Sequence, residues 1–218
     1  MSAVLKTKKR EEIYYPESDG KPMAETDVHR SQMNYLIESL KLFFENQKTA
    51  YVSGNIMFYY EEGNPYKSFS PDVMVCFDIS PGDRRVYKLW EEKQFPQVIF
   101  EISSRATWGE DLNKKWFLYQ KFGVKEYYIF DPEYDYLPEP LIAYRLKKGE
   151  LRQVKMKNGR IFSEELGLEI VDTGEGLRLY DPQTKEFIRT LEEERELRLK
   201  VDEENRLLRE EIERLKNK

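Results

Sequence analysis

Three consecutive segments in the middle of the chain limit its fold more than any other feature. Residues 97–102 and 126–130 are short apolar runs bounded by Pro or by polar turns, which is typical of strands buried on both faces. Between them, residues 109–122 have the length of a helix, and Gly123 can end it. A strand, a helix and a strand in this order predict a βαβ unit, whose two strands lie parallel.

Further elements are predicted on both sides of this unit. Apolar residues at helical spacing predict a first helix over residues 25–47, with Thr26 or Asp27 as its cap. Alternation and turn residues predict strands over residues 51–60 and 73–77, a hairpin formed by residues 141–146 and 151–156, and short edge strands between residues 161 and 180.

The composition limits the class of protein. The 218 residues are 39% hydrophobic and 35% charged, which allows one domain of ordinary size with an appendage. No apolar run is long enough to cross a membrane. No apolar segment follows the basic N-terminus, so we expect no signal peptide. Cys76 is the only cysteine and stands inside an apolar run, so we interpret it as a small buried hydrophobe. We expect a cytoplasmic protein.

The net charge of −5 argues against a broadly basic surface for nucleic acid. Any nucleic acid would have to use a local patch. Two groups of basic residues, one on each side of the predicted strand 97–102, are the candidates: Arg84, Arg85, Lys88 and Lys93, and Arg105, Lys114, Lys115 and Lys121. The alternative is a solvated face balanced by neighbouring acids, and for any single charge we prefer it.

Two acids stand at the edges of apolar runs, Asp72 before the predicted strand 73–77 and Glu101 near the end of the strand 97–102. A carboxylate is costly in such a place unless something pairs with it. Two acids on neighbouring strands can share a divalent cation such as Mg²⁺, which usually needs only one or two carboxylates. This pattern indicates phosphodiester hydrolysis. The alternative is a pair of strand-end acids that face water or cap a loop.

One face of the predicted helix 109–122 carries Asp111, Lys115 and Tyr119, which are spaced i, i+4 and i+8. Because this helix follows the strand that bears Glu101, Lys115 can reach back toward it and stabilise charge that builds on a phosphate. Lys114 is the competing residue, although it lies about 100° off this face. The alternative is a surface Asp–Lys pair that contributes little.

The last thirty residues differ from the rest of the chain. Residues 189–218 contain no Gly or Pro and consist mostly of strong helix formers. A heptad register fits them, and Asn205 at an a position favours a two-stranded parallel coiled coil, so we expect a homodimer. The alternative is a single charged helix. The core positions of the register are Leu191, Arg198, Asn205 and Ile212 at a, and Glu194, Val201, Leu208 and Leu215 at d.

Several of these residues together resemble a known family. They are Pro71-Asp72, Glu101, His29 and the stretches 15–26 (YPESDGKPMAET), 111–119 (DLNKKWFLY) and 123–132 (GVKEYYIFDP). The combination resembles the Uma2 family of endonuclease-like proteins, formerly called DUF820, and the resemblance covers residues 14–180. The family is placed in the PD-(D/E)xK nuclease superfamily. The resemblance therefore implies an α/β (α+β) fold with a restriction-endonuclease-like mixed β-sheet core flanked by helices.

The resemblance also implies roles for individual residues. Asp72 and Glu101 would hold Mg²⁺ (or Mn²⁺), with the backbone carbonyl of Ile102 as a further ligand, and DNA would be the substrate. The usual lysine of the superfamily would stand at Ser103, and the family has Lys115 on the following helix instead. The possible supporting residues are Glu25, His29, Ser103, Asp111 and Tyr119. For His29 the alternative is a helix-start residue bonded to a neighbour.

We therefore predict an N-terminal arm (residues 1–24), a PD-(D/E)xK nuclease-like domain (25–188) and a charged C-terminal helix that is a possible coiled coil (189–218). The first functional hypothesis is a metal-dependent endonuclease with Asp72, Glu101 and Lys115 as its catalytic residues. The second is a catalytically inactive nuclease-fold protein that binds nucleic acid or protein as a scaffold and dimerises through its C-terminal helix.

Overall fold

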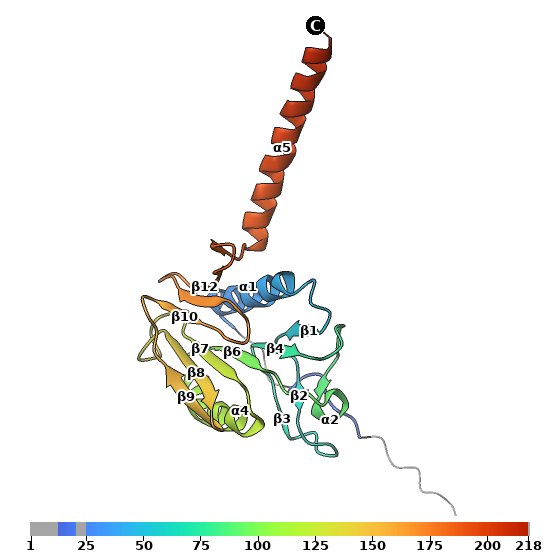
Figure 1. Ribbon diagram of the computed structural model, residues 1–218. Helices are drawn as coiled ribbons and strands as arrows, with labels where there is room; N and C mark the ends of the chain where they lie inside the picture. Colours follow the sequence, from blue (N-terminus) through green and yellow to red (C-terminus); the bar gives the residue numbers. More distant parts are fainter. Residues whose placement is uncertain (1–12, 21–24, 218) are drawn as a thin grey trace, which may run out of the picture.

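The computed structural model describes residues 13–20 and 25–217. Its central element is a six-stranded mixed sheet with the order β1-β4-β6-β7-β8-β9 (Figure 1). The strands β6 and β7 pair in parallel, and every other neighbouring pair is antiparallel. The strands are β1 (Ala50–Ser53), β4 (Val73–Phe77), β6 (Val98–Ile102), β7 (Glu126–Phe130), β8 (Leu141–Lys147) and β9 (Glu150–Val154).

The predicted mixed sheet flanked by helices is confirmed, and so are the parallel pair of the βαβ unit and the β8–β9 hairpin. Gly123 ends the crossover helix with φ 76°, a left-handed conformation that glycine adopts at no steric cost. The strands β6 and β7 are buried along their whole length, as expected for a parallel pair covered on both faces.

The two faces of the sheet are covered by different elements. One face packs against α1 (Asp27–Phe43) and against a four-stranded antiparallel sheet, and the other packs against α4 (Trp116–Phe122) and a three-stranded sheet. The four-stranded sheet comprises β10 (Arg160–Phe162), β11 (Glu169–Asp172), β12 (Leu177–Asp181) and β13 (Glu186–Phe187). The three-stranded sheet comprises β2 (Phe58–Tyr59), β3 (Ser68–Phe69) and β5 (Tyr87–Lys88), and α2 (Leu89–Glu92) follows β5.

Two predicted elements differ from the structure. The strand predicted over residues 51–60 is two strands in two sheets, β1 and β2, because the chain bends at Gly54 and at Asn55, whose φ is 50°. The helix predicted over residues 109–122 is divided into α3 (Trp108–Glu110), the π-helical segment η1 (Asp111–Lys115) and α4. Both differences lie next to the candidate site.

The C-terminal helix α5 (Leu191–Lys216) extends away from the sheets, and none of its residues is buried (Figure 1). A capping box of Thr190 and Glu193 begins it, and Arg178 on β12 binds Glu193 at 2.8 Å. The division at residue 188 stays a prediction, and the predicted N-terminal arm lies largely outside the described residues. Within the described ranges, no helix has the length and apolar character of a membrane span.

Candidate active site

The sheet brings the two predicted acids together. Because β4 and β6 are antiparallel with Val73 opposite Phe100, Asp72 comes to lie beside the end of β6. The Ile102 N–H donates to Asp72 Oδ2 at 2.7 Å, and the Asp72 N–H lies 3.4 Å from Glu101 Oε2. The two carboxylates therefore lie next to each other, where β4 begins and β6 ends.

Glu101 is fully buried and is held from the helical side of the sheet. Lys115 Nζ lies 2.8 Å from Glu101 Oε2, and the Tyr119 hydroxyl donates to Oε1 at 2.5 Å. The same ammonium lies 2.9 Å from Asp111 Oδ1, and the Ser103 hydroxyl donates to Asp111 Oδ2 at 2.9 Å. The structure thus brings Lys115 and Tyr119 to the Glu101 carboxylate, whereas Asp111 joins them through Lys115 and Ser103 joins through Asp111.

The π-helical turn η1 carries this cluster. Single π turns inside α-helices occur frequently at functional sites. The Tyr127 hydroxyl on β7 donates to the Asp111 carbonyl at 3.0 Å and ties the irregular turn to the sheet. Lys114 points away from the cluster: it is 82% exposed and pairs with Glu110 at 2.9 Å. Of the two candidate lysines, only Lys115 contacts Glu101.

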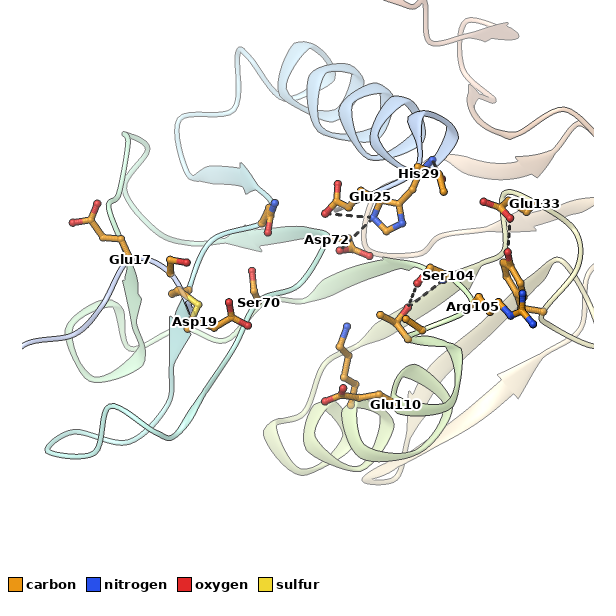
Figure 2. A pocket seen from close by; sticks show the side chains of 18 residues that line it. Glu17, Asp19, Glu25, His29, Ser70, Asp72, Ser104, Arg105, Glu110 and Glu133 are labelled. Carbon is orange, nitrogen blue, oxygen red and sulfur yellow. Dashed lines mark hydrogen bonds and ion pairs between the residues drawn. The ribbon is translucent and has the colours of Figure 1, made fainter. Parts of the chain in front are cut away.

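Glu25 and His29 approach from the opposite side of the site, Glu25 just before the cap of α1 and His29 in its first turn (Figure 2). The Thr26 side chain caps α1 by accepting from the His29 N–H, which places both residues at the start of the helix. His29 Nε2 lies 3.8 Å from Asp72 Oδ1 and 3.9 Å from Glu25 Oε1. These distances allow charge interaction but no direct hydrogen bond.

The buried charges shift one another's pKa. Burial raises the pKa of Glu101 well above its usual value, and the Lys115 ammonium only partly offsets this. For Asp72, burial acts in the same direction, but His29, Lys115 and the Ile102 N–H outweigh it and lower the pKa. The two carboxylates are therefore unequal, although they lie side by side.

Both basic groups of the site have raised pKa values. Burial alone would lower the pKa of Lys115, but Glu101, Asp111 and Asp72 outweigh it. Burial would likewise lower the pKa of His29, and Asp72 and Glu25 outweigh it. Lys115 is therefore a positively charged donor at neutral pH and cannot accept a proton from water.

The donor set fits a small divalent cation. Two adjacent carboxylates suit Mg²⁺, which keeps several of its waters and usually needs only one or two protein carboxylates. His29 Nε2 is buried and makes no hydrogen bond within the described residues, so a polar atom of the site still lacks a donor or acceptor. In the same residues no group of three or more His, Cys, Asp or Glu side chains could hold a metal by itself.

Of these side chains, Asp72, Lys115, His29 and Glu25 line a cavity of about 690 Å³ (Figure 2), and the fully buried Glu101 is not among the residues of its wall. Its wall is predominantly acidic, with Lys115, Arg105 and His29 as the basic groups. Glu133 and Tyr136 enter from the loop after β7, which the buried Asp131 organises by accepting four backbone N–H groups. The acids of the wall are Glu17, Asp19, Glu25, Asp72, Glu110 and Glu133.

Sequence reasoning missed one residue that positions the site, Gly54. A Cβ at this position would lie 2.0 Å from the Asp72 carbonyl oxygen and 2.7 Å from Ile37 Cδ1. Only glycine therefore allows the chain to pass so close to Asp72, and the Asn55 N–H then binds the Pro71 carbonyl at 2.8 Å. A signal was present, because an isolated glycine inside a strand pattern indicates a bend or a close backbone approach.

Comparison with known proteins gives one family. The family model Uma2, described as "Putative restriction endonuclease", matches residues 5–174. A solved structure described as "a putative nuclease belonging to DUF820 from Anabaena variabilis" is similar at 15% sequence identity and a TM-score of 0.49, and the match covers 67% of this chain and 76% of that chain. No curated protein matches the chain.

Proposed function

Because the chain belongs to the Uma2 family, we propose that it is a divalent-metal-dependent endonuclease that hydrolyses phosphodiester bonds in DNA. One observation carries this proposal: Lys115 reaches Glu101 from the following helix, while Ser103 occupies the usual position of the lysine and binds Asp111 instead. The positive charge that the superfamily's lysine places two residues after the second acid is thus supplied here by Lys115 on η1.

In this proposal Asp72 and Glu101 hold Mg²⁺ or Mn²⁺, and the Ile102 carbonyl is a further candidate ligand. When bound, the cation supplies Lewis-acid polarisation of the phosphate and makes water more acidic. Lys115 stays protonated because Glu101 and Asp111 raise its pKa, so its role is to donate hydrogen bonds to a phosphate oxygen or to orient the attacking water. Tyr119 and Asp111 hold Glu101 and Lys115 in place.

His29 and Glu25 are supporting residues in the same proposal. Their position across the cavity from Lys115 puts a titratable imidazole within 3.8 Å of Asp72 Oδ1. An imidazole there can orient Asp72 or exchange a proton with water in the cavity.

The test is cleavage of plasmid DNA and of a mixed pool of labelled oligonucleotides with Mg²⁺ or Mn²⁺. We expect cleavage by the native protein, loss of cleavage in EDTA, and loss in Asp72→Asn, which keeps the size of the side chain. The matched control is Asp181→Asn, a nearly buried carboxylate of the four-stranded sheet, which should cleave normally. Cleavage that persists in EDTA or in Asp72→Asn would contradict the proposal.

We also propose that two copies associate through α5. Five of its apolar side chains, Leu191, Val201, Leu208, Ile212 and Leu215, are 45–69% exposed and occupy a and d positions of the heptad. Light scattering of the full chain should show a dimer. The alternative function, an inactive nuclease-fold scaffold, also requires this association. A dimer that binds DNA but cuts it under no metal condition would favour that alternative.

A further inference from the structure

A second cavity of about 570 Å³ adjoins the active-site cavity. The two share Asp19, Met57, Ser70, Glu110 and Lys115, so Lys115 stands at their boundary. We call the second cavity the side groove; its remaining wall includes Tyr60, Phe69, Lys114, Phe117 and Lys121. A polymer with one phosphate at Lys115 therefore has the side groove directly beside that phosphate.

The charge of the side groove is opposite to that of the active-site cavity. Three lysines, Lys114, Lys115 and Lys121, face two acids, Asp19 and Glu110. The Lys114–Glu110 pair is exposed, with side chains 82% and 47% accessible, so exchanging it for a phosphate costs little. The six acids of the active-site cavity oppose a phosphate unless a cation is bound, whereas in the side groove the lysines outnumber the acids by one.

An aromatic ring stands among these lysines. Phe117 is 65% exposed, more than any other phenylalanine in the described ranges, and it packs edge-on against Trp116. Tyr60 and Phe69 lie on the groove's other elements, with ring centres 6.1 Å apart. Accessible rings beside cationic side chains are the usual way in which proteins bind single-stranded nucleic acid, because a base stacks on the ring and its phosphates pair with the cations.

We propose that the side groove binds the nucleotide next to the scissile phosphate, with its base unpaired and stacked on Phe117, so that the substrate is single-stranded or locally unpaired nucleic acid. This inference rests on the proposed nuclease function. A base inside an intact duplex has no free face to offer a ring. The net charge of −5 and the small number of lysines in the side groove also disfavour contacts along both backbones of a duplex.

The test measures binding separately from cleavage. Fluorescence anisotropy of a labelled oligothymidylate, and of a duplex of equal length, is recorded with the full chain in Ca²⁺. We expect the single strand to bind more tightly than the duplex, and Phe117→Ala to weaken single-strand binding about fivefold or more. Phe117→Leu should weaken it similarly and Phe117→Tyr should preserve it, which separates stacking from a general apolar effect.

Two matched controls accompany these variants. Phe162→Ala removes a phenylalanine that is 48% exposed on β10 and should leave binding unchanged. Lys121→Gln should lower the slope of log affinity against log salt by about 0.7, whereas Lys48→Gln, in the turn between α1 and β1, should not. Duplex binding as tight as single-strand binding, or unchanged binding by Phe117→Ala, overturns the inference.

The two proposals fail in different ways. If Phe117→Ala binds the single strand normally and Asp72→Asn loses cleavage, the side-groove proposal is rejected and the nuclease proposal stands. If Phe117→Ala binds the single strand more weakly and Asp72→Asn cleaves normally, the side groove stands as a strand-binding site. The assignment of Asp72 as a catalytic residue is then rejected.

Discussion

Two buried glutamates on neighbouring strands, Glu101 on β6 and Glu126 on β7, look alike in sequence and differ in the structure. Both are nearly inaccessible, both accept from a tyrosine, and both pair with a basic side chain, Lys115 or Arg145. Because β6 and β7 are parallel with Glu101 opposite Ile129, the two glutamates lie toward opposite ends of the pair.

The surroundings of the two carboxylates separate them. Glu126 accepts from four donors, which complete its hydrogen bonding: the Arg145 guanidinium, the Tyr128 and Ser163 hydroxyls, and the Glu164 N–H. Glu101 lies beside Asp72 and Lys115, which both line the acidic cavity, and burial raises its pKa. A buried acid therefore indicates a site only when a second acid and an open cavity accompany it.

The largest expected effect separates the two glutamates by activity. Glu101→Gln should lower metal-dependent cleavage at least about 100-fold, because the variant loses a carboxylate of the cation site. Glu126→Gln should stay within about threefold of the native rate, because its partners Arg145, Ser163 and Glu164 do not line the cavity, whereas Glu101 contacts the lining residue Lys115. The measurement is the initial rate at saturating Mn²⁺, with folding checked by circular dichroism. Similar losses in both variants would remove the distinction.

Stability should show the opposite order. Glu126→Gln should lower the free energy of unfolding by about 1–3 kcal/mol, because Arg145 loses a buried charged partner. Glu101→Gln should cost no more than about 0.5 kcal/mol in metal-free buffer, because Lys115 keeps the buried Asp111 as its charged partner and the amide can accept from Lys115 and donate to Tyr119. Urea unfolding in EDTA measures both values, and a larger cost for Glu101→Gln would mean that its role is structural.

A change at Gly54 should affect the site of Asp72 and Glu101 and leave the surroundings of Glu126 unchanged. Gly54→Ala should destabilise the fold by about 1–3 kcal/mol and reduce cleavage, because the new methyl group would displace the Asp72 carbonyl. Gly109→Ala is the control: it lies near the same site, and an added Cβ there meets no atom within 4 Å. Normal stability and activity in Gly54→Ala would show that Asp72 does not depend on this close approach.

The smallest effect is expected from the tail, which contacts neither glutamate. Truncation after Arg195 keeps the Thr190–Glu193 capping box and the Arg178–Glu193 pair, so the unfolding free energy of the body should change by less than about 0.5 kcal/mol. Light scattering should show that the dimer is lost. A monomer before and after truncation would remove the role proposed for α5.

Much of the architecture followed from local patterns. Apolar runs predicted β6 and β7, the turn residues 147–149 predicted the β8–β9 hairpin, and Gly123 predicted the end of the crossover helix. The spacing of Asp111, Lys115 and Tyr119 predicted their common direction, although the helix contains a π turn. The small sheet of β2, β3 and β5 was not predicted, because two-residue strands have no detectable period.

The amino-acid sequence alone determined the longer strands and helices and marked Asp72 and Glu101 as carboxylates that need a partner, since these features depend on spacing between near neighbours. Only the tertiary structure decided which of those carboxylates share a site. The approach of His29 to Asp72, the passage of Gly54 beside the Asp72 carbonyl, and the different surroundings of Glu101 and Glu126 depend on strand pairing and on contacts between distant parts of the chain. Such contacts are set by the packing of the whole core, which no local pattern records.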